Sequence, residues 1–299
     1  MQTKVSILFL FFLLSVPLSG QEYNFRLYFG SNYYQGDLAP RKSPLSFSPG
    51  KAGWGGSMGM KLTDWMDGNV RFMLGQIHSD DDYAVDGTRR ERNLNFYTPF
   101  YEVGLNAEFN INKLMPFLNK YGLEYYFTLG VNFFHFEPKT IYQGKVVNLQ
   151  PLGTEGQGLP GFPDRYSCNQ INIPMGIAIR FPLSPELYIG LEFSPRYTFT
   201  DYLDDVSTIY VNYYDLIEAN RPVTAALSNR TGELYGTDIL DVPTGTPRGN
   251  PEDKDWYFFA GISISYHFGK DVEDRILQAK LDKAERKKKR EEMLLNEEQ

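Results

Sequence analysis

Two stretches of the chain carry residue types that could catalyse a reaction or bind a metal ion. His78 and Ser79 precede Asp80, Asp81 and Asp82, and together they supply a base, a nucleophile and carboxylates. Adjacent residues of a strand point to opposite faces, so His78 is not expected to reach Ser79. By the phase of their strands, His135 faces lipid and His267 lies at the other end of the molecule, so neither replaces His78. We therefore predict no enzyme.

The second stretch is the acidic group Asp201, Asp204 and Asp205, whose carboxylates are the ligand type that calcium prefers. The stretch lacks the glycine and closing glutamate of a known calcium loop. We favour a loop held by solvated or salt-bridged carboxylates, and we predict neither a metal nor a cofactor. Cys168 is the only cysteine, which excludes an intramolecular disulfide, and without a nearby histidine in sequence it is expected to be inert.

Charged residues also recur at alternate positions of apolar segments, where they would point into the interior of a barrel. The predicted network consists of Arg26, Arg71, Glu102, Glu108, Arg180, Glu192 and Arg196, with Lys61 in the same phase. Such a network could line a proton or ion path, or its charges could pair and fill the interior. We favour the second interpretation, because eight strands leave a lumen just wide enough for side chains.

The segment Trp256–Phe268 is the clearest element that would position these residues. Its apolar face alternates with smaller or more polar residues over seven positions and carries an aromatic residue at each end. A period of two indicates a strand, and this length suits a tilted strand that crosses a bilayer.

Seven further segments alternate in the same way, so we predict an all-β fold, an eight-stranded antiparallel transmembrane β-barrel. The predicted strands are Glu22–Gly30, Gly53–Leu62, Val70–Gly75, Thr98–Phe109, Tyr125–Phe134, Ile171–Phe181, Leu187–Arg196 and Trp256–Phe268. Long connections follow the first, third, fifth and seventh strands, and short turns follow the others. This alternation is typical of outer-membrane barrels, with long extracellular loops and a periplasmic C-terminus.

The ends of the chain divide it into three parts. Residues 1–20 read as a secretory signal peptide, because Lys4 precedes a short apolar run that ends in small residues. Residues 21–269 form the predicted barrel, which is moderately acidic and gives no reason to invoke nucleic acid. Residues 270–299 hold nine basic and nine acidic residues without Gly or Pro, which predicts a periplasmic helix.

The predicted helix carries i,i+4 charge pairs at Asp271/Arg275, Asp282/Arg286 and Glu285/Lys289, but only a narrow apolar stripe. Two interpretations stay open: a solvated tail, or a docking element for a periplasmic partner. In the second case the binding residues would be those of the basic block, Arg286, Lys287, Lys288, Lys289 and Arg290.

The loop sequences resemble those of a known family. Leu149–Gly158, Thr200–Ser207 and Arg248–Asn250 are similar to motifs of the PorG family of outer-membrane proteins, as are Asn32–Leu38 and Arg92–Leu94. The resemblance covers residues 23–268, and the tail matches only in kind. It implies a non-catalytic outer-membrane component of the type IX protein secretion machinery, which tethers a periplasmic ring of a lipoprotein and its partner. It also implies a loop-structuring role for the three aspartates.

Two functional hypotheses therefore compete. The first is a structural anchor that contacts outer-membrane lipid and the ring proteins. The second is a small transport or ligand-binding barrel that uses its outer loops.

Overall fold

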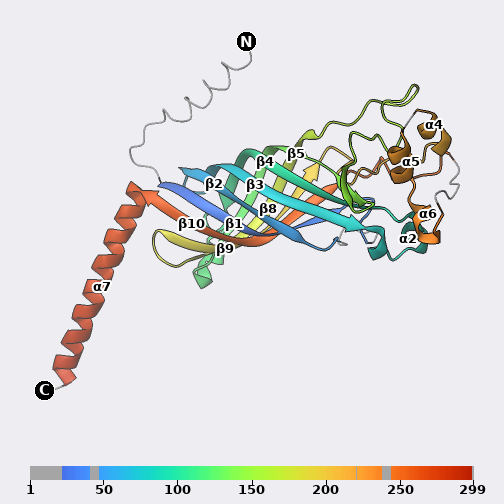
Figure 1. The fold of residues 1–299 in the computed structure, drawn as a ribbon. Helices are drawn as coiled ribbons and strands as arrows, with labels where there is room; N and C mark the ends of the chain where they lie inside the picture. Colours follow the sequence, from blue (N-terminus) through green and yellow to red (C-terminus); the bar gives the residue numbers. More distant parts are fainter. Residues whose placement is uncertain (1–21, 41–46, 220, 238–243, 298–299) are drawn as a thin grey trace, which may run out of the picture.

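The computed structural model describes residues 22–40, 47–219, 221–237 and 244–297. Eight long strands form one closed antiparallel barrel, which confirms the predicted fold class (Figure 1). Their bounds are β1 Glu22–Gln35, β2 Lys51–Thr63, β3 Met66–Asp80, β4 Asn95–Asn110, β5 Glu124–Phe136, β8 Asn169–Pro182, β9 Leu187–Thr198 and β10 Trp256–Gly269. The predicted signal peptide lies outside the described residues.

The sheet closes because its first and last strands pair. Strand β1 pairs with β10 from Glu22 opposite Gly269 to Gln35 opposite Trp256, and β3 pairs with β4 on the far side. Each of these eight described strands thus has a neighbour on both sides, so the barrel wall itself has no unpaired edge.

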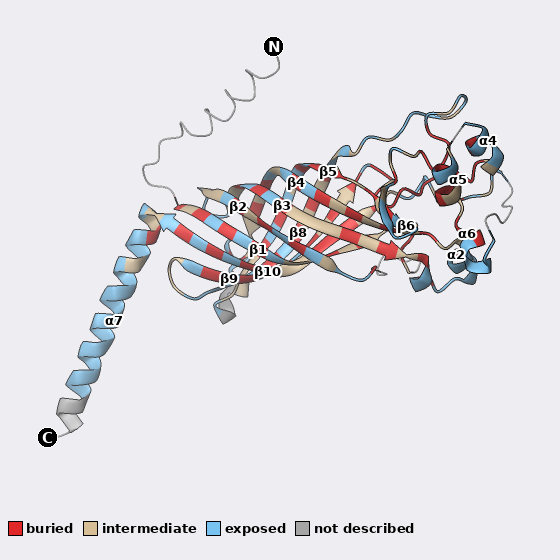
Figure 2. Ribbon diagram, viewed as in Figure 1, coloured by how far each residue is buried: buried red, intermediate tan, exposed pale blue. Residues whose placement is uncertain are grey.

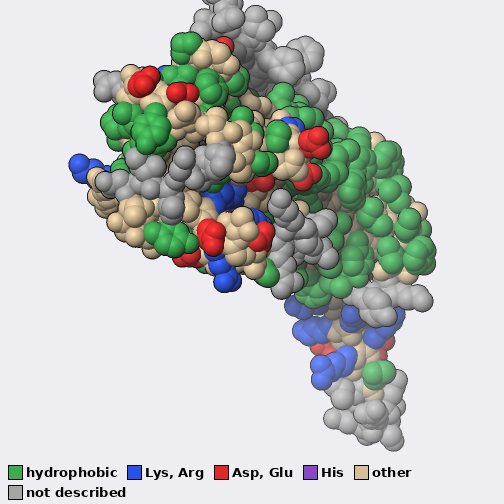
Figure 3. All heavy atoms as spheres, turned by 90° about the vertical axis from the view of Figure 1, so that its right-hand side faces the viewer, with side chains coloured by type: hydrophobic (Ala, Val, Ile, Leu, Met, Phe, Trp, Pro, Cys, Tyr) green, Lys and Arg blue, Asp and Glu red, His purple; other side chains and the backbone are tan. Residues whose placement is uncertain are grey.

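The alternation of side chains along the strands separates an apolar outside from a polar inside. On β1, Phe25, Leu27 and Phe29 are exposed, whereas Arg26 and Tyr28 are buried. Bands of buried and exposed residues follow each other along the strands in Figure 2, and Figure 3 shows hydrophobic side chains gathered over the barrel wall. Apolar side chains exposed in a continuous belt are the outer surface expected of a barrel in lipid.

Helix α7, Lys270–Glu297, begins directly after β10 and projects from the end of the barrel opposite the long loops (Figure 1). We call the two ends the helix end and the loop end. Gly269 makes the abrupt change of direction with a φ of 114°, a conformation that glycine adopts without a steric penalty. Among the described residues, no helix combines the length and apolar character needed to span a membrane.

The rim of the barrel holds the first two turns of α7, and one predicted helix pair is wrong. Arg275 bonds Glu22 of β1 at 2.8 Å instead of Asp271, and Asp271 lies 3.6 Å from Lys61. Glu22 is mostly buried and also binds His267, so a carboxylate at the rim competes better for Arg275 than an exposed one on the helix. Lys61 therefore lies at the rim, although its phase in the strand had placed it in the interior network.

Several elements extend or interrupt the loops in ways the alternation did not predict. Strand β1 continues five residues beyond Gly30, and the connection after β5 contains a hairpin that pairs with β4 through Tyr97 and Lys139. The additional elements are η1 Asp81–Tyr83, α2 Gly87–Arg92, α3 Ile111–Leu114, η2 Pro116–Tyr121, β6 Lys139–Tyr142, β7 Lys145–Asn148, α4 Tyr213–Glu218, α5 Pro222–Ser228 and α6 Thr231–Tyr235. Most of these lie at the loop end.

Barrel closure generates a first testable prediction, at the seam between β1 and β10. Gly261 faces Gly30, and a Cβ on Gly261 would lie 2.4 Å from the carbonyl oxygen of Phe29. Gly261→Ala should therefore destabilise the closed barrel by about 1–3 kcal/mol, the usual cost of overpacking. The folded fraction after refolding into lipid vesicles, measured as the unheated band on an SDS gel, checks this expectation.

A matched control is Gly56→Ala on β2, where the nearest atom to a new Cβ is 3.3 Å away. It should refold almost like the parent protein. Equal folded fractions for the two variants would contradict a sterically constrained seam.

Candidate functional site

The barrel interior brings the seven predicted lumen charges together, all of them buried. Glu108 of β4 accepts hydrogen bonds from Arg26 at 2.6 Å and from Arg180 at 2.7 Å. Glu192 pairs with Arg71. Because these ion pairs join strands on different sides of the barrel, they cross-link its interior.

A second group, nearer the loop end, is centred on Glu102. This carboxylate accepts hydrogen bonds from Arg196 at 2.9 Å, from Asn172 at 3.1 Å and from the Tyr257 hydroxyl. A carboxylate that accepts several charge-assisted hydrogen bonds holds its donors in place.

Aromatic rings complete the filling of the interior. The guanidinium of Arg71 lies 3.9 Å from the ring centre of Tyr28, and that of Arg180 lies 4.0 Å from the ring centre of Tyr126. Such cation–π contacts stabilise a buried arginine. The network holds four arginines and three glutamates, so one positive charge has no carboxylate partner of its own. The aromatic rings help to stabilise this excess positive charge.

The central carboxylate provides a second prediction. Glu108→Gln would leave Arg26 and Arg180 buried without their anion, and breaking a buried pair in this way costs about 3–5 kcal/mol. We expect the urea midpoint for unfolding in lipid vesicles to fall accordingly.

The control is Glu285→Gln on α7, which removes an exposed pair with Lys289. Exposed pairs of this kind contribute little, so the midpoint should not change. If the midpoint for Glu108→Gln is as little changed as that for Glu285→Gln, the interior ion pairs do not stabilise the barrel.

A separate buried polar cluster lies at the loop end. We call it the loop cap, and its central carboxylates are those of Asp201, Asp204, Asp205, Asp255 and Glu155. The Tyr34 hydroxyl donates to Asp204 at 2.6 Å and lies 3.1 Å from Asp255. Asp255 also accepts from the backbone N–H of Leu203 at 2.8 Å, and Asp204 accepts from that of Val206 at 2.9 Å. The first strand, the longest loop and the start of β10 are thereby tied together.

Asp205 and Glu155 tie this loop to the one after β5. Asp205 accepts from the hydroxyls of Thr154 and Tyr166, both at 2.6 Å. Arg248 donates to Glu155 at 2.9 Å and to the backbone carbonyl of Asp205 at 2.6 Å. Asp205 has a φ of 67°, so the backbone turns sharply where these contacts meet.

The loop after β3 joins the same cluster through Arg92. Its guanidinium binds Asp81 at 2.7 Å and donates to the backbone carbonyl of Arg248 at 2.6 Å. The backbone N–H of Asn250 donates to Asp37 at 2.8 Å. All four loops at this end are therefore linked by charged or polar contacts.

The structure places Asp201, Asp204 and Asp205 together in the loop cap, but their main partners were not predicted from the sequence. Sequence reasoning assigned no role to Tyr34, Asp37, Glu155, Arg248 and Asp255, and it weighed Asp81 only as a catalytic carboxylate. Several of them lie inside the loop motifs quoted above, which is the signal that could have identified them. In the described part of the chain, no group of three or more His, Cys, Asp or Glu residues is arranged to hold a metal ion.

The residues that first suggested catalysis are kept apart. Ser79 is buried and donates to the backbone carbonyl of Leu38 at 2.6 Å, whereas His78 lies on the outer wall of β3. His135 stacks on Tyr101 and bonds Asn169. Burial raises the pKa of the Cys168 thiol to about 11, which disfavours its reactive thiolate.

Burial also sets the acidity of the loop cap. It raises the pKa of Asp201 to about 8, and the nearby Asp37 adds to the rise. It raises the pKa of Asp205 to about 6, although Arg248 opposes this shift. Burial and the repulsion between neighbouring carboxylates raise the pKa values of Asp204 and Asp255 as well.

These shifts predict how the loop cap responds to pH. Because the aspartate pKa values are raised in the closed cap, its carboxyls stay protonated at pH values where those of the open loops are ionised. The closed cap is therefore most stable below about pH 4, the ordinary aspartate pKa. The stability should decrease as pH rises to about 8, the pKa of Asp201. Amide hydrogen exchange at Leu203 and Val206, corrected for intrinsic rates, should therefore become less protected between pH 5 and pH 9.

Asp201→Asn is the control for this titration, because it removes one of the carboxyls that must lose a proton. Its protection should vary less with pH than that of the parent protein. Protection that increases with pH in the parent would contradict the assigned sign.

The basic block of α7 is exposed on all sides, and part of it is neutralised within the helix. Lys289 lies 2.7 Å from Glu285, as predicted, while Lys287 and Lys288 lie 3.7 and 3.9 Å from Glu291 and Glu292. The predicted Asp282/Arg286 pair does not form, because Asp282 accepts from Gln278 instead.

Two arginines of the block differ from the lysines between them. Within the described side chains, no carboxylate lies within ion-pair distance of Arg286 or Arg290. They are four residues apart and so share one face of the helix, which Lys283 extends by another turn. We call Lys283, Arg286 and Arg290 the cationic face.

Eight closed strands with an apolar belt and an interior of buried ion pairs define the fold of an eight-stranded outer-membrane β-barrel. Residues 3–219 match the family model described as "Domain of unknown function (DUF6089)", and the chain belongs to this family. No curated protein matches the chain.

Three solved barrels illustrate the structural likeness. Neisserial surface protein A is 7% identical, with 82% of this chain and 97% of that chain covered and a TM-score of 0.39. Ail of Yersinia pestis is 9% identical, with coverages of 83% and 99% and a TM-score of 0.37. OprG from Pseudomonas aeruginosa is 9% identical, with coverages of 85% and 99% and a TM-score of 0.36. Likeness at this level carries no argument about function.

Proposed function

We propose that this protein is a non-catalytic outer-membrane anchor of the type IX protein secretion machinery, which tethers a periplasmic ring complex through its terminal helix. The observation that carries the proposal is the position of α7, a charged helix that extends from the barrel end opposite the loops. The resemblance of the loop motifs to the PorG family supports the assignment to this machinery.

The orientation follows from the same asymmetry. In outer-membrane barrels the long loops face the outside of the cell and the short turns face the periplasm. The short turn between β2 and β3 lies at the helix end, whereas the loops of the cap lie at the other end. On this basis α7 extends into the periplasm.

The barrel interior favours an anchor over a transport protein. Arginine–glutamate pairs and aromatic rings occupy it, and their ionic bonds would have to break to open a passage. A barrel cross-linked in this way is suited to bear a load, because it resists deformation when a partner pulls on one end.

The docking surface that we assign to the ring is the cationic face of α7. Since no described carboxylate pairs with Arg286 or Arg290, these cations lose no such ion pair when they bind an acidic protein surface. Lys287, Lys288 and Lys289, in contrast, must first exchange a glutamate. The unpaired arginines also offer bidentate hydrogen bonds to carboxylates, which lysines do not.

This assignment makes the fourth prediction. Arg286→Gln/Arg290→Gln should reduce the ring proteins that co-purify with the barrel from native outer membranes by about tenfold or more, because several charge-assisted bonds are lost. Quantitative immunoblots of the ring proteins, normalised to the recovered barrel, provide the measurement.

Lys288→Gln/Lys289→Gln is the matched control, since it removes the same net charge from the same helix but only cations that already have a partner. It should retain most of the ring proteins. Undiminished recovery after deletion of residues 270–299 would exclude the tail as the tether, and an equal loss in both double variants would exclude the cationic face.

A further inference from the structure

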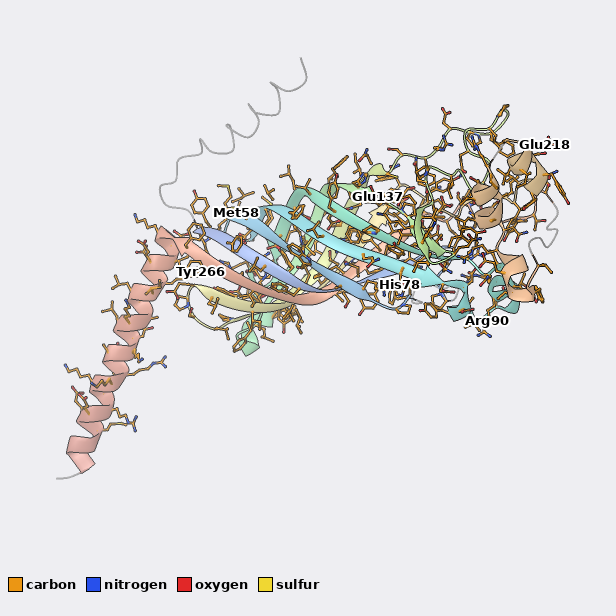
Figure 4. All side chains as sticks on the ribbon, viewed as in Figure 1. Met58, His78, Arg90, Glu137, Glu218 and Tyr266 are labelled. Carbon is orange, nitrogen blue, oxygen red and sulfur yellow. The ribbon has the colours of Figure 1, made fainter. Side chains whose placement is uncertain are left out.

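A pocket of about 460 Å³ lies on the outer wall of the barrel, just below the loop cap. Its floor includes outward-facing residues of two paired strands, with His78 of β3 opposite Tyr97 of β4, Gln76 two residues before His78, and Asn95 two residues before Tyr97. Lys51, at the start of β2, forms part of the wall. Figure 4 shows His78 on this wall, toward the loop end and far from Tyr266 at the helix end.

The pocket lies where the apolar belt ends. On β3 the outward residues are apolar through Val70, Phe72 and Leu74 and become polar at Gln76 and His78. His78 is four residues beyond Leu74, roughly 13 Å along the strand. Because the strand is tilted by about 40°, His78 lies about 10 Å above Leu74, and the headgroup region of one leaflet is about 5–8 Å deep. The pocket therefore spans the headgroup level and its outer edge.

The polar groups of the pocket have little to bond within the protein. The Nδ1 atom of His78 is buried and has no hydrogen-bond partner. Among the described contacts, the side chains of Lys51 and Gln76 and the hydroxyl of Tyr97 have none either. Polar groups without a partner inside the protein are available to bond a ligand in the pocket.

The composition of the pocket indicates which chemical class would fit. Amide and neutral imidazole groups offer both donors and acceptors, and the Asp80 carboxylate adds acceptors, as a molecule with many hydroxyl groups requires. The oxygen of Asn95 is already bonded to Thr140, which leaves its amide N–H groups as donors. The Tyr97 ring adds an apolar face with a polar tip, against which a flat ring of C–H groups packs.

We propose that this pocket binds a sugar ring presented at the outer face of the membrane. The volume lies in the range of small-molecule sites, about 300–1,000 Å³. The ring could come from the headgroup of a glycolipid in the surrounding leaflet or from a free saccharide, and the two sources share the same chemistry. Gln76, His78 and Asn95 recognise its hydroxyl groups, and Tyr97 packs against its face.

The test uses the full-length mature protein in lipid nanodiscs and saturation-transfer difference NMR. One arm adds methyl glycosides of glucose, galactose, mannose and N-acetylglucosamine, and the other uses nanodiscs that contain lipopolysaccharide. We expect transfer to sugar protons in at least one arm. Transfer in the first arm identifies a free ring as sufficient, whereas transfer in the second arm alone identifies the glycolipid headgroup; both outcomes support the proposal.

Two variants link the signal to the pocket. Tyr97→Leu and Gln76→Leu should each weaken the sugar signal by about tenfold, the usual effect of losing one good contact. Tyr101→Leu is the matched control, because Tyr101 lies four residues beyond Tyr97 on the same face of β4 but does not line the pocket. It should keep the signal.

Three results would overturn the proposal. These are no transfer in either arm, equal transfer in the pocket variants and the control, or displacement of the sugar signal in all variants alike by inorganic phosphate. An unheated SDS gel confirms that each variant is folded, so a lost signal is not a lost barrel. None of these results bears on the recovery of ring proteins through α7, so this inference and the proposed anchor role can fail separately.

Discussion

Closure of the sheet is the constraint on which the rest of this structure depends. In lipid every backbone N–H and C=O needs a partner inside the protein, because no water can replace it. The first and last strands meet this need by pairing along their full lengths, with glycines at Gly30 and Gly261 where the backbones leave no room for a side chain. Once eight strands close, the diameter is set, and the interior must be filled by whatever points inward.

The interior and the loop cap are filled in the same polar manner. A soluble domain of this size would bury most of its apolar residues, but here many of them face the outer wall, and the main buried apolar cluster lies toward the loop end. The inward positions instead carry arginines, glutamates and tyrosines whose bonds run across the barrel. The loop cap continues this pattern with carboxylates, guanidinium groups and tyrosine hydroxyls. Apolar packing joins in at the loop end, where Phe96, Phe134 and Phe136 form part of a buried cluster.

The sequence predicted the part of the fold that has a period of two. Each of the eight strands was found because inward and outward environments differ along it, and Arg26 and Glu108 could be placed inside by phase alone. Beyond the belt this contrast disappears. The hairpin β6–β7 and helices α4 to α6 were missed for that reason, since their residues are selected by contacts with distant loops.

The loop contacts show why partners are harder to predict than elements. Arg248 and Glu155 are 93 residues apart, and Tyr34 and Asp255 are separated by 221. No local pattern links such residues, although the motifs that contain them drew attention to the right segments. The pairing of Arg275 with Glu22 depends in the same way on where the barrel rim lies.

The direct passage from β10 into α7 has a mechanical meaning. The last strand residue, Gly269, is paired with Glu22, and the helix begins at the next residue, with Val272 buried and Arg275 bonded to the rim. A helix of 28 residues is about 42 Å long at 1.5 Å per residue. Because no linker lets it swivel, the direction in which it points is fixed to the seam of the barrel. Any protein bound along α7 would therefore fix the rotation of the barrel about the membrane normal. Copies of the barrel held at equal angles around a ring would then all present the same strands to their neighbours.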